Sequence, residues 1–554
     1  MLDKLKNDKK FQFGVLIILG VIFFFVYSFL IFDNELTRFT WPDETANYFF
    51  ITNYIDNSNF SFYEPLNEIG SNLIKPRSFN VYQNNLVPGS FLGMLLIYGL
   101  IGKIIGTKLI LFLTPLLAVI SGLFFYKILL KIFKSNIAFL SALLFFINPA
   151  WWYYASLSML PNISFFSFLL IGFYCLLNLN KNQKKNTLWL ILGSFFIALA
   201  LIIRTNEFVW VLGVILFLAI VYRCKLKWYY ILIFIAVNCL VFLPIFYYNQ
   251  ITYGDYLSFG YLQLEQGNGL VSQLPPEFQT ANQSAIYNFI KFLILPFGFS
   301  AGAIIHNINQ YFIQLFWWLF IPSVIGLFVL IKNFHKQAKG VYLLITFCLS
   351  VYLAIYYGSW IFEDQMTLQL NKIGLSYVRY FLPIYILCLP LIAIFYLHLI
   401  GLFTARGGKS KKFKIALSTF LAFCFIAFTV NVVYLSGNDN LLNIKQHIKD
   451  YNQSNQKIVE LTEPEAVIIS QRSDKIFFPQ RKVIAKWSFD EAGYWADLLK
   501  ADVPLYYYAF EGQEYIDEFN YNLYDYYGFE LMQPVKINQT ETLYKIKFTE
   551  YEQE

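Results

Sequence analysis

Residues 11–32 read FQFGVLIILGVIFFFVYSFLIF, and the sequence WPDET follows at residues 41–45. The first stretch carries no charged residue and is long enough to cross a bilayer, which takes roughly 20 apolar residues. Basic residues precede it at positions 4–10, and it lacks the small-residue cleavage pattern of a signal peptide. We therefore predict a retained first span, with the N-terminus in the cytoplasm and residues 41–45 outside.

The composition indicates many further spans. The chain has 554 residues, of which 57% are hydrophobic and 14% charged, and its formal net charge is +7. Many of the cations lie in short loops between apolar runs, a pattern that sets orientation in a membrane and gives no indication of nucleic-acid binding. The six cysteines lie in or beside apolar segments and show neither a disulfide framework nor a zinc spacing. The sequence predicts an α-helical, multi-pass integral membrane protein.

Basic loops predict the number of spans. The cations at positions 127–134 indicate a cytoplasmic loop, so an odd number of crossings must separate them from the outer residues that follow the first span. Two apolar stretches lie in that interval, and we expect the shorter one, residues 86–101, to be a surface or re-entrant element. The stretch at 286–305 is surplus for the same reason. The rule gives about eleven spans, or about thirteen if both surplus stretches cross.

The last part of the chain changes character. Residues 436–554 alternate polar and apolar segments, which predicts a small extracytoplasmic α/β domain following a membrane domain at 1–435. This tail shows no glycine-rich phosphate loop and no metal spacing, so we expect a scaffold or a lid. The expected strands cover residues 466–470, 504–509, 531–537 and 543–548, and the expected helices cover 490–501 and 512–524.

Two adjacent acids, Asp43 and Glu44, lie at a predicted helix start. Pro42 suits the first helical position, so both carboxylates fall in the first turn, where the helix dipole favours negative charge. Apolar residues between 46 and 55 predict a helix that lies along the membrane surface. Acids at this position can simply stabilise a helix, and this interpretation stays open beside a catalytic one.

Several stretches, taken in order, resemble the GT-C class of polytopic glycosyltransferases, and within it the protein O-mannosyltransferase and aminoarabinose transferase type. Members carry an acidic pair or a single acid soon after the first span, matched here by Asp43 and Glu44. No single motif is specific, and the order of the motifs carries the resemblance over about residues 11–435. The other matching stretches are KPRS at 75–78, NLVPG at 85–89, INP at 147–149, LIIRTN at 201–206 and YVRYFLP at 377–383.

The resemblance implies transfer of a sugar from a polyprenyl- or dolichyl-phosphate donor to an acceptor hydroxyl on the extracytoplasmic face, with inversion. It implies Asp43 as the general base and Glu44 as the group that orients the acceptor, which is a protein or a glycolipid. Membrane lipids are the other expected partners. The cations expected to hold the donor phosphate are Arg379, Lys75, Arg77 and Arg204.

Each of these cations has a plainer interpretation. Arg379 suits an anchor to lipid head groups, Lys75 and Arg77 suit a solvated turn, and Arg204 suits an ion pair with Glu207, three positions on.

The acceptor or its sugar is expected to contact four further residues in predicted outer loops. These residues are Trp151, Trp152, Glu363 and Asp364. Tryptophans also form belts at membrane surfaces, and an acidic pair also occurs in solvated loops.

No cofactor is predicted. Many members of the class carry an acid in the second outer loop that assists metal binding or the acceptor, and residues 159–162 (MLPN) have none. Hard cations need more oxygen ligands than Asp43 alone supplies, although a divalent metal stays open.

Three other functions are compatible with a polytopic chain. A lipid-linked oligosaccharide flippase or transporter more often shows internal repeats and charged or broken spans. An O-antigen polymerase or ligase has its key charges in a large late outer loop, and the loop at 248–285 lacks an arginine cluster. A purely structural anchor for the tail needs far fewer spans.

Overall fold

The computed structural model describes most of the chain. The described residues are 8–32, 38–179, 185–222, 227–262, 298–332, 337–360, 362, 372–405 and 411–549. Their contacts divide the chain into two compact units. The first unit comprises residues 1–31, 111–245 and 264–443, and the second comprises 32–110, 246–263 and 444–554. The proposed division of the chain at residues 435 and 436 remains a prediction.

Among the described residues, seven helices are long and apolar enough to cross a membrane, or up to nine if each of two bent helix pairs forms one span. Three shorter apolar helices, at Leu92–Ile105, Pro161–Leu176 and Thr205–Val221, fall below the length of a full span. The chain is therefore an integral membrane protein, and the predicted count of about eleven spans remains a prediction.

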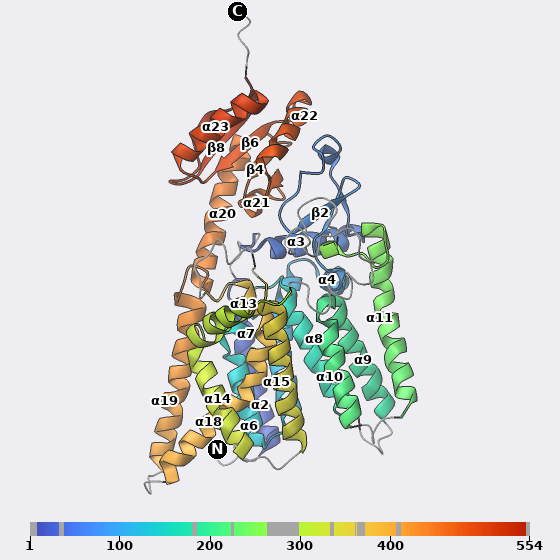
Figure 1. The fold of residues 1–554 in the computed structure, drawn as a ribbon, viewed down its shortest axis with the longest axis vertical. Coiled ribbons are helices and arrows are strands. Elements are labelled where there is room, and N and C mark those ends of the chain that lie inside the picture. The colour runs from blue at the N-terminus through green and yellow to red at the C-terminus, as the bar shows by residue number, and fades with distance from the viewer. Residues whose placement is uncertain are drawn as a thin grey trace, which may run out of the picture. The chain divides into compact units, whose positions relative to one another are not determined.

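The first unit is a bundle of apolar helices (Figure 1), in which α6 lies beside both α2 and α18, and α8 packs on α9. Gly326 of α14 lies so close to α18 that a Cβ atom there would be 2.0 Å from the carbonyl oxygen of Leu391. The helices are α2 (Lys9–Tyr27), α5 (Leu113–Leu129), α6 (Ser135–Phe146), α7 (Pro149–Ser156), α8 (Pro161–Leu176), α9 (Asn186–Ile203), α10 (Phe208–Val221), α13 (Ala301–Ile308), α14 (Trp317–Lys332), α15 (Gln337–Gly358), α17 (Ser376–Tyr380), α18 (Leu382–Ala405) and α19 (Lys411–Val430). Helix α11 (Tyr229–Tyr253) and helix α20 (Leu441–Leu461) each run from one unit into the other.

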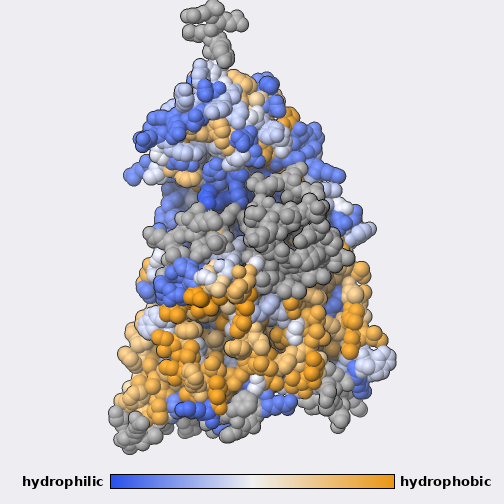
Figure 2. Space-filling view, viewed as in Figure 1, coloured by the Kyte–Doolittle hydropathy of each residue, from blue (hydrophilic) through white to orange (hydrophobic). Residues whose placement is uncertain are grey.

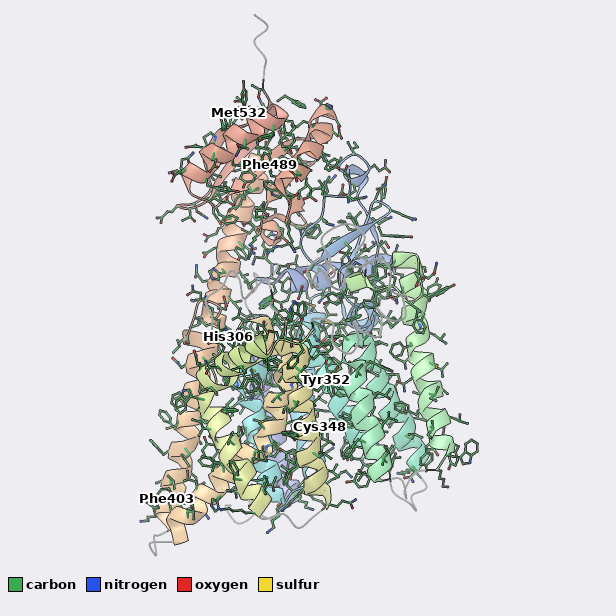
Figure 3. The ribbon with its side chains drawn as sticks, in the orientation of Figure 1. His306, Cys348, Tyr352, Phe403, Phe489 and Met532 are labelled. Carbon is green, nitrogen blue, oxygen red and sulfur yellow. The ribbon has the colours of Figure 1, made fainter. Side chains whose placement is uncertain are left out.

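The outer faces of these helices are apolar. Hydrophobic residues cover the visible face of the helical unit, whereas hydrophilic residues predominate over the sheet of the tail (Figure 2). On α15, Phe347 is 68% exposed and the neighbouring Cys348 is also exposed, one turn before Tyr352 (Figure 3). Exposed apolar side chains along a long helix fit contact with lipid.

Two of the helix pairs are bent. Helices α6 and α7 meet at 46°, and the segment Ala301–Gln314 meets α14 at 98°. Asn148 begins α7, because its side chain accepts a hydrogen bond from the backbone N–H of Trp151 and Pro149 occupies the first turn. Most of the surplus stretch at 286–305 lies outside the described residues.

The second unit contains two sheets and the helix that bears the acidic pair. A small antiparallel sheet has the order β1 (Phe62–Tyr63), β3 (Asn85–Pro88), β2 (Phe79–Tyr82), and helices α3 (Pro42–Asn57) and α4 (Leu92–Ile105) flank it in sequence. The larger sheet has the order β5 (Lys482–Ala485), β4 (Val467–Ser470), β6 (Leu505–Ala509), β8 (Thr542–Phe548), β7 (Phe529–Lys536). Strand β4 is parallel to β5 and β6, and β8 is antiparallel to β6 and β7.

The predicted elements of the tail are confirmed. Strands β4 and β6 lie within their expected ranges, whereas β7, β8 and α23 (Gln513–Tyr527) overlap theirs with ends shifted by one to three residues. The first expected helix, at 490–501, begins as a 3-10 turn (Phe489–Tyr494) and continues as α22 (Trp495–Lys500). The sequence did not predict helix α20, strand β5 or the short helix α21 (Asp474–Phe477).

The core of the tail also receives a residue from the first loop. Ile74, 1% exposed, packs in the same hydrophobic cluster as Trp495 and Phe519, and Lys75 forms a parallel bridge with Ile484 of β5. Residues 74 and 75 thus extend the sheet that the tail builds.

Candidate functional site

The acidic pair lies where the sequence predicts it. Pro42 is the first residue of α3, and Asp43 and Glu44 occupy its first turn. The side chain of Trp41, the residue before the helix, makes no capping hydrogen bond, so the carboxylates supply the negative charge that this helix end favours. Glu44 is buried, at 2% exposure, and Asp43 is partly exposed.

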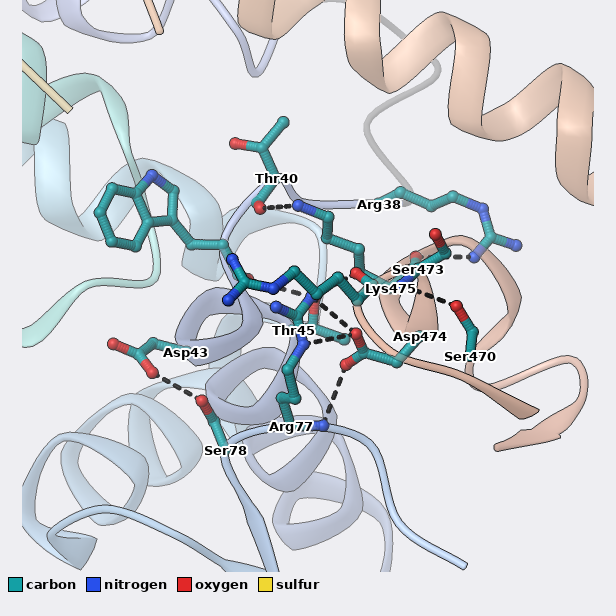
Figure 4. A network of polar contacts seen from close by, with 12 residues as sticks. Arg38, Thr40, Asp43, Thr45, Arg77, Ser78, Ser470, Ser473, Asp474 and Lys475 are labelled. Carbon is teal, nitrogen blue, oxygen red and sulfur yellow. Dashed lines mark hydrogen bonds and ion pairs between the residues drawn. The ribbon is translucent and has the colours of Figure 1, made fainter. Parts of the chain in front are cut away.

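Ser78 holds the carboxylate of Asp43. Its hydroxyl donates a hydrogen bond of 2.7 Å to Oδ1 of Asp43 (Figure 4). Ser78 itself has a φ of 64°, and its carbonyl oxygen accepts a 3.0 Å hydrogen bond from the backbone N–H of Gly89. A Cβ atom at position 89 would lie 2.6 Å from that oxygen, so the backbone around Ser78 requires glycine there.

Lys75 and Arg77 both contact the tail. The guanidinium of Arg77 pairs with Asp474 at 2.7 Å, and its backbone N–H donates to the other oxygen of the same carboxylate at 2.9 Å. Burial beside β5 lowers the pKa of Lys75, a shift that Glu491 opposes and Lys486 reinforces. Phosphate binding by these two cations remains a prediction.

Arg204 and Glu207 form a buried ion pair, as predicted from their spacing. Nη2 and Nε of Arg204 lie 2.7 Å and 3.0 Å from Oε1 of Glu207, and both residues are at most 6% exposed. The hydroxyl of Tyr357 donates to Oε1 of Glu207 at 2.6 Å, and the indole N–H of Trp210 donates to its Oε2. Glu207 therefore fixes the direction of the Arg204 side chain.

Arg379 and Arg204 both lie beside the ring of Tyr380. The guanidinium carbon of Arg204 lies 4.9 Å from the centroid of the Tyr380 ring, and that of Arg379 lies 5.0 Å from it. Tyr357 stacks on the same ring at 4.5 Å. Arg379 is 9% exposed and donates a 3.2 Å hydrogen bond to the hydroxyl of Ser376. The structure thus brings together two of the predicted phosphate ligands in the first unit.

Two of the four predicted acceptor residues, Trp151 and Trp152, are buried. Trp151 is fully buried and packs on Phe145, with ring centroids 4.5 Å apart. Trp152 is 7% exposed, and its indole N–H donates to the hydroxyl of Tyr434 at 3.3 Å. Both side chains are therefore packed inside the first unit, and sugar contact by them remains a prediction. Glu363 and Asp364 lie outside the described residues.

The sequence did not indicate the residues that contact Asp43, Arg379 and Arg77. Ser78 and Tyr380 directly follow Arg77 and Arg379 in motifs that the sequence does show, so adjacency was an available signal. Asp474 had no local signal. Within the described ranges, no group of three or more His, Cys, Asp or Glu side chains is arranged to hold a metal ion.

No protein-family model matches the sequence, and no curated protein matches it. Solved structures do match. An oligosaccharyltransferase of Archaeoglobus fulgidus in the apo form aligns with a TM-score of 0.54 and 12% identity, over 91% of this chain and 70% of that one. The same organism's AglB, in complex with an inhibitory peptide and a dolichol-phosphate, aligns with a TM-score of 0.55 and 13% identity, over 90% of this chain and 69% of that one.

A third structure matches over nearly its whole length. ArnT of Cupriavidus metallidurans, bound to undecaprenyl phosphate, aligns with a TM-score of 0.52 and 10% identity, over 96% of this chain and 97% of that one. At such low identities the similarity concerns the fold. The chain therefore shares the fold of these oligosaccharyltransferase and ArnT structures.

Proposed function

We propose that this protein is a membrane glycosyltransferase that moves a sugar from a polyprenyl- or dolichyl-phosphate donor to an acceptor hydroxyl. The fold supports this proposal, because similar structures contain a dolichol-phosphate in AglB and undecaprenyl phosphate in ArnT. The apolar outer faces of the helices suit a donor that remains in the bilayer. The acceptor is a protein or a glycolipid, and the reaction takes place on the extracytoplasmic face.

The observation that carries the proposal is the fixed carboxylate of Asp43 at the start of α3. A general base needs a set direction toward the proton that it removes, and the hydrogen bond from Ser78 sets one oxygen of Asp43. Asp43 takes the proton of the acceptor hydroxyl while the hydroxyl oxygen attacks the anomeric carbon. The bond from that carbon to the lipid phosphate breaks, and this single displacement inverts the anomeric centre. Glu44 orients the acceptor.

The departing phosphate requires positive charge, which we assign first to Arg379. Its planar guanidinium suits phosphate oxygens, and Arg204 shares the Tyr380 ring with it. Lys75 and Arg77 are further proposed ligands. Cations stabilise developing negative charge best when they need no rearrangement during the reaction, and Glu207 holds the Arg204 side chain in place.

The proposed membrane topology puts α3, with Asp43, on the outer side. The N-terminus is cytoplasmic, and α3 and the tail are extracytoplasmic. About eleven spans satisfy the distribution of basic loops. The tail at 436–554 follows the membrane domain at 1–435.

The test uses purified full-length protein with a panel of polyprenyl-phosphate sugars and compares wild type with Asp43→Asn. We expect Asp43→Asn to reduce transfer by about 10²–10⁴-fold, the usual contribution of general base catalysis. Asp56→Asn is the matched control, because Asp56 is an exposed acid on the same helix. Undiminished transfer by Asp43→Asn would overturn the assignment of the base. If wild type binds no lipid-linked donor, the transferase proposal is wrong.

A further inference from the structure

One short segment of the tail contacts both chain segments that carry the Asp43–Ser78 hydrogen bond. The segment comprises residues 474–480, which include α21 and the residues directly after it. It belongs to the same compact unit as α3 and the first loop. Figure 4 shows Asp474 joined to Arg77, Lys475 joined to Thr40, and Ser78 joined to Asp43.

The first contact fixes the chain immediately before Ser78. Asp474 is 1% exposed and accepts from both the side chain and the backbone N–H of Arg77, through its two carboxylate oxygens. A second hydrogen bond joins the Arg77 guanidinium to the carbonyl oxygen of Arg472. The position of the Ser78 hydroxyl is therefore set one residue away from an ion pair whose carboxylate is buried.

The second contact fixes the chain before Asp43. Arg38 is 4% exposed and donates to the carbonyl oxygen of Phe478 at 3.1 Å and to the side chain of Gln480 at 2.7 Å. Lys475 donates to the carbonyl oxygen of Thr40. These bonds anchor the residues that lead into the first turn of α3.

An aromatic contact completes the attachment. The ring of Phe478 lies 4.9 Å from that of Phe49 on α3 and 5.0 Å from that of Phe79, the residue after Ser78. One tail side chain thus packs against both the helix that bears Asp43 and the strand that begins beside Ser78.

We propose that Asp474 is a positioning residue for the transfer reaction, which sets the direction of the Asp43 carboxylate through Arg77 and Ser78. The inference rests on the proposed role of Asp43 as the base. It gives the tail a part in catalysis beyond that of a scaffold or a lid. The geometry explains why the attachment matters, because a misplacement of about 1 Å at a reacting group lowers a rate by about 10²-fold.

The test compares Asp474→Asn with Glu64→Gln in full-length protein. Glu64 is a buried acid in the first loop and pairs with Lys482 of β5 at 3.1 Å, so it also joins loop to tail, but not through α21. We expect Asp474→Asn to lower kcat about 10–100-fold and Glu64→Gln to leave kcat unchanged. Equal kcat values in Asp474→Asn and wild type would overturn the proposal.

A double-mutant cycle separates positioning from a general loss of structure. If Asp474 acts through Ser78, the variant Ser78→Ala/Asp474→Asn has the same kcat as Ser78→Ala alone. Independent, additive losses would overturn the proposal. Asp474→Glu, which retains the carboxylate, is expected to recover more activity than Asp474→Asn.

Hydrogen exchange tests the inference without turnover. We expect amides in peptides that cover residues 41–48 to exchange faster in Asp474→Asn than in wild type or Glu64→Gln. Unchanged exchange in Asp474→Asn would overturn the positioning role even if the protein proves to transfer no sugar. Conversely, active wild type with an inactive Asp43→Asn and an unaffected Asp474→Asn leaves the proposed function intact and removes only this inference.

Discussion

Arg204 and Arg379 place their guanidinium carbons 4.9 Å and 5.0 Å from the centroid of one ring, that of Tyr380. Two like charges beside one ring repel one another unless other charges compensate them. Glu207 compensates Arg204 directly, at 2.7 Å. A bound phosphate would add negative charge to the same cluster, which is the basis of the first prediction.

Replacing Arg379 is expected to weaken donor binding. A charge-assisted hydrogen bond to phosphate contributes about 1.5–3 kcal/mol, so Arg379→Gln should raise the Kd for a polyprenyl phosphate by roughly 10–100-fold. Arg379→Lys should recover only part of this, because an ammonium group lacks the planar fork. The measurement is donor binding by calorimetry or by thermal stabilisation.

Lys332→Gln serves as the control for Arg379, because Lys332 is an exposed cation at the end of α14 in the same unit. A donor Kd in Arg379→Gln equal to that of Lys332→Gln would show that Arg379 does not bind the phosphate.

Replacing Glu207 is expected to destabilise the first unit. Its carboxylate balances the buried Arg204, and removing one partner of a buried ion pair costs about 3–5 kcal/mol. Glu207→Gln should therefore lower the thermal midpoint clearly. Asp497→Asn is a useful contrast, since Asp497 forms an ion pair with Lys500 at the same i,i+3 spacing but on an exposed surface. The loss of stability in Asp497→Asn should be about 0–1 kcal/mol. Similar shifts of the thermal midpoint in Glu207→Gln and Asp497→Asn would contradict the prediction.

Replacing Gly326 is expected to separate two helices of the bundle. A Cβ atom there would lie 2.0 Å from the backbone oxygen of Leu391, which cannot move without α18. Overpacking of this kind costs about 1–3 kcal/mol. Gly326→Ala should lower the thermal midpoint, whereas Gly14→Ala on α2, where a Cβ meets nothing within 4 Å, should leave it unchanged or raise it. An unchanged thermal midpoint in Gly326→Ala would show that the two helices tolerate a wider spacing.

The stability of the tail is expected to fall in acid through Glu463. Burial raises the pKa of this carboxyl, but hydrogen bonds from Lys545 and Tyr506 outweigh it and lower the pKa to about 2, from an ordinary value of 4.5. Because the folded pKa is the lower one, the contribution is complete above pH 4.5 and is lost as the pH falls toward 2.

The pair between Glu463 and Lys545 is largely exposed, so the contribution of Glu463 is at most about 1 kcal/mol. As the pH is lowered from 5 to 2, the thermal midpoint should fall less steeply in Glu463→Gln than in wild type. Glu460→Gln, an exposed acid three residues earlier, should follow wild type. The same slope in Glu463→Gln and wild type would contradict the prediction.

Local signals in the sequence predicted much of the tail and the start of α3. Pro42 followed by two acids marks a helix start regardless of the rest of the chain, and the apolar run at 504–509 marks a buried strand. The partner of Arg77 was beyond reach, because Asp474 lies 397 positions away and shares no pattern with it. Similarly, four consecutive aromatic residues at 151–154 have no alternation that tells a buried side chain from an exposed one.

The joining of residues 32–110 to residues 444–554 in one compact unit also has a consequence for biosynthesis. Arg77 leaves the ribosome 397 residues before Asp474, which at about 5–20 residues per second is a delay of roughly 20–80 s. During that time Ile74 has no tail core in which to bury its side chain. The nascent chain must therefore insert the intervening spans first, and the later synthesis of the tail determines when the first loop can fold.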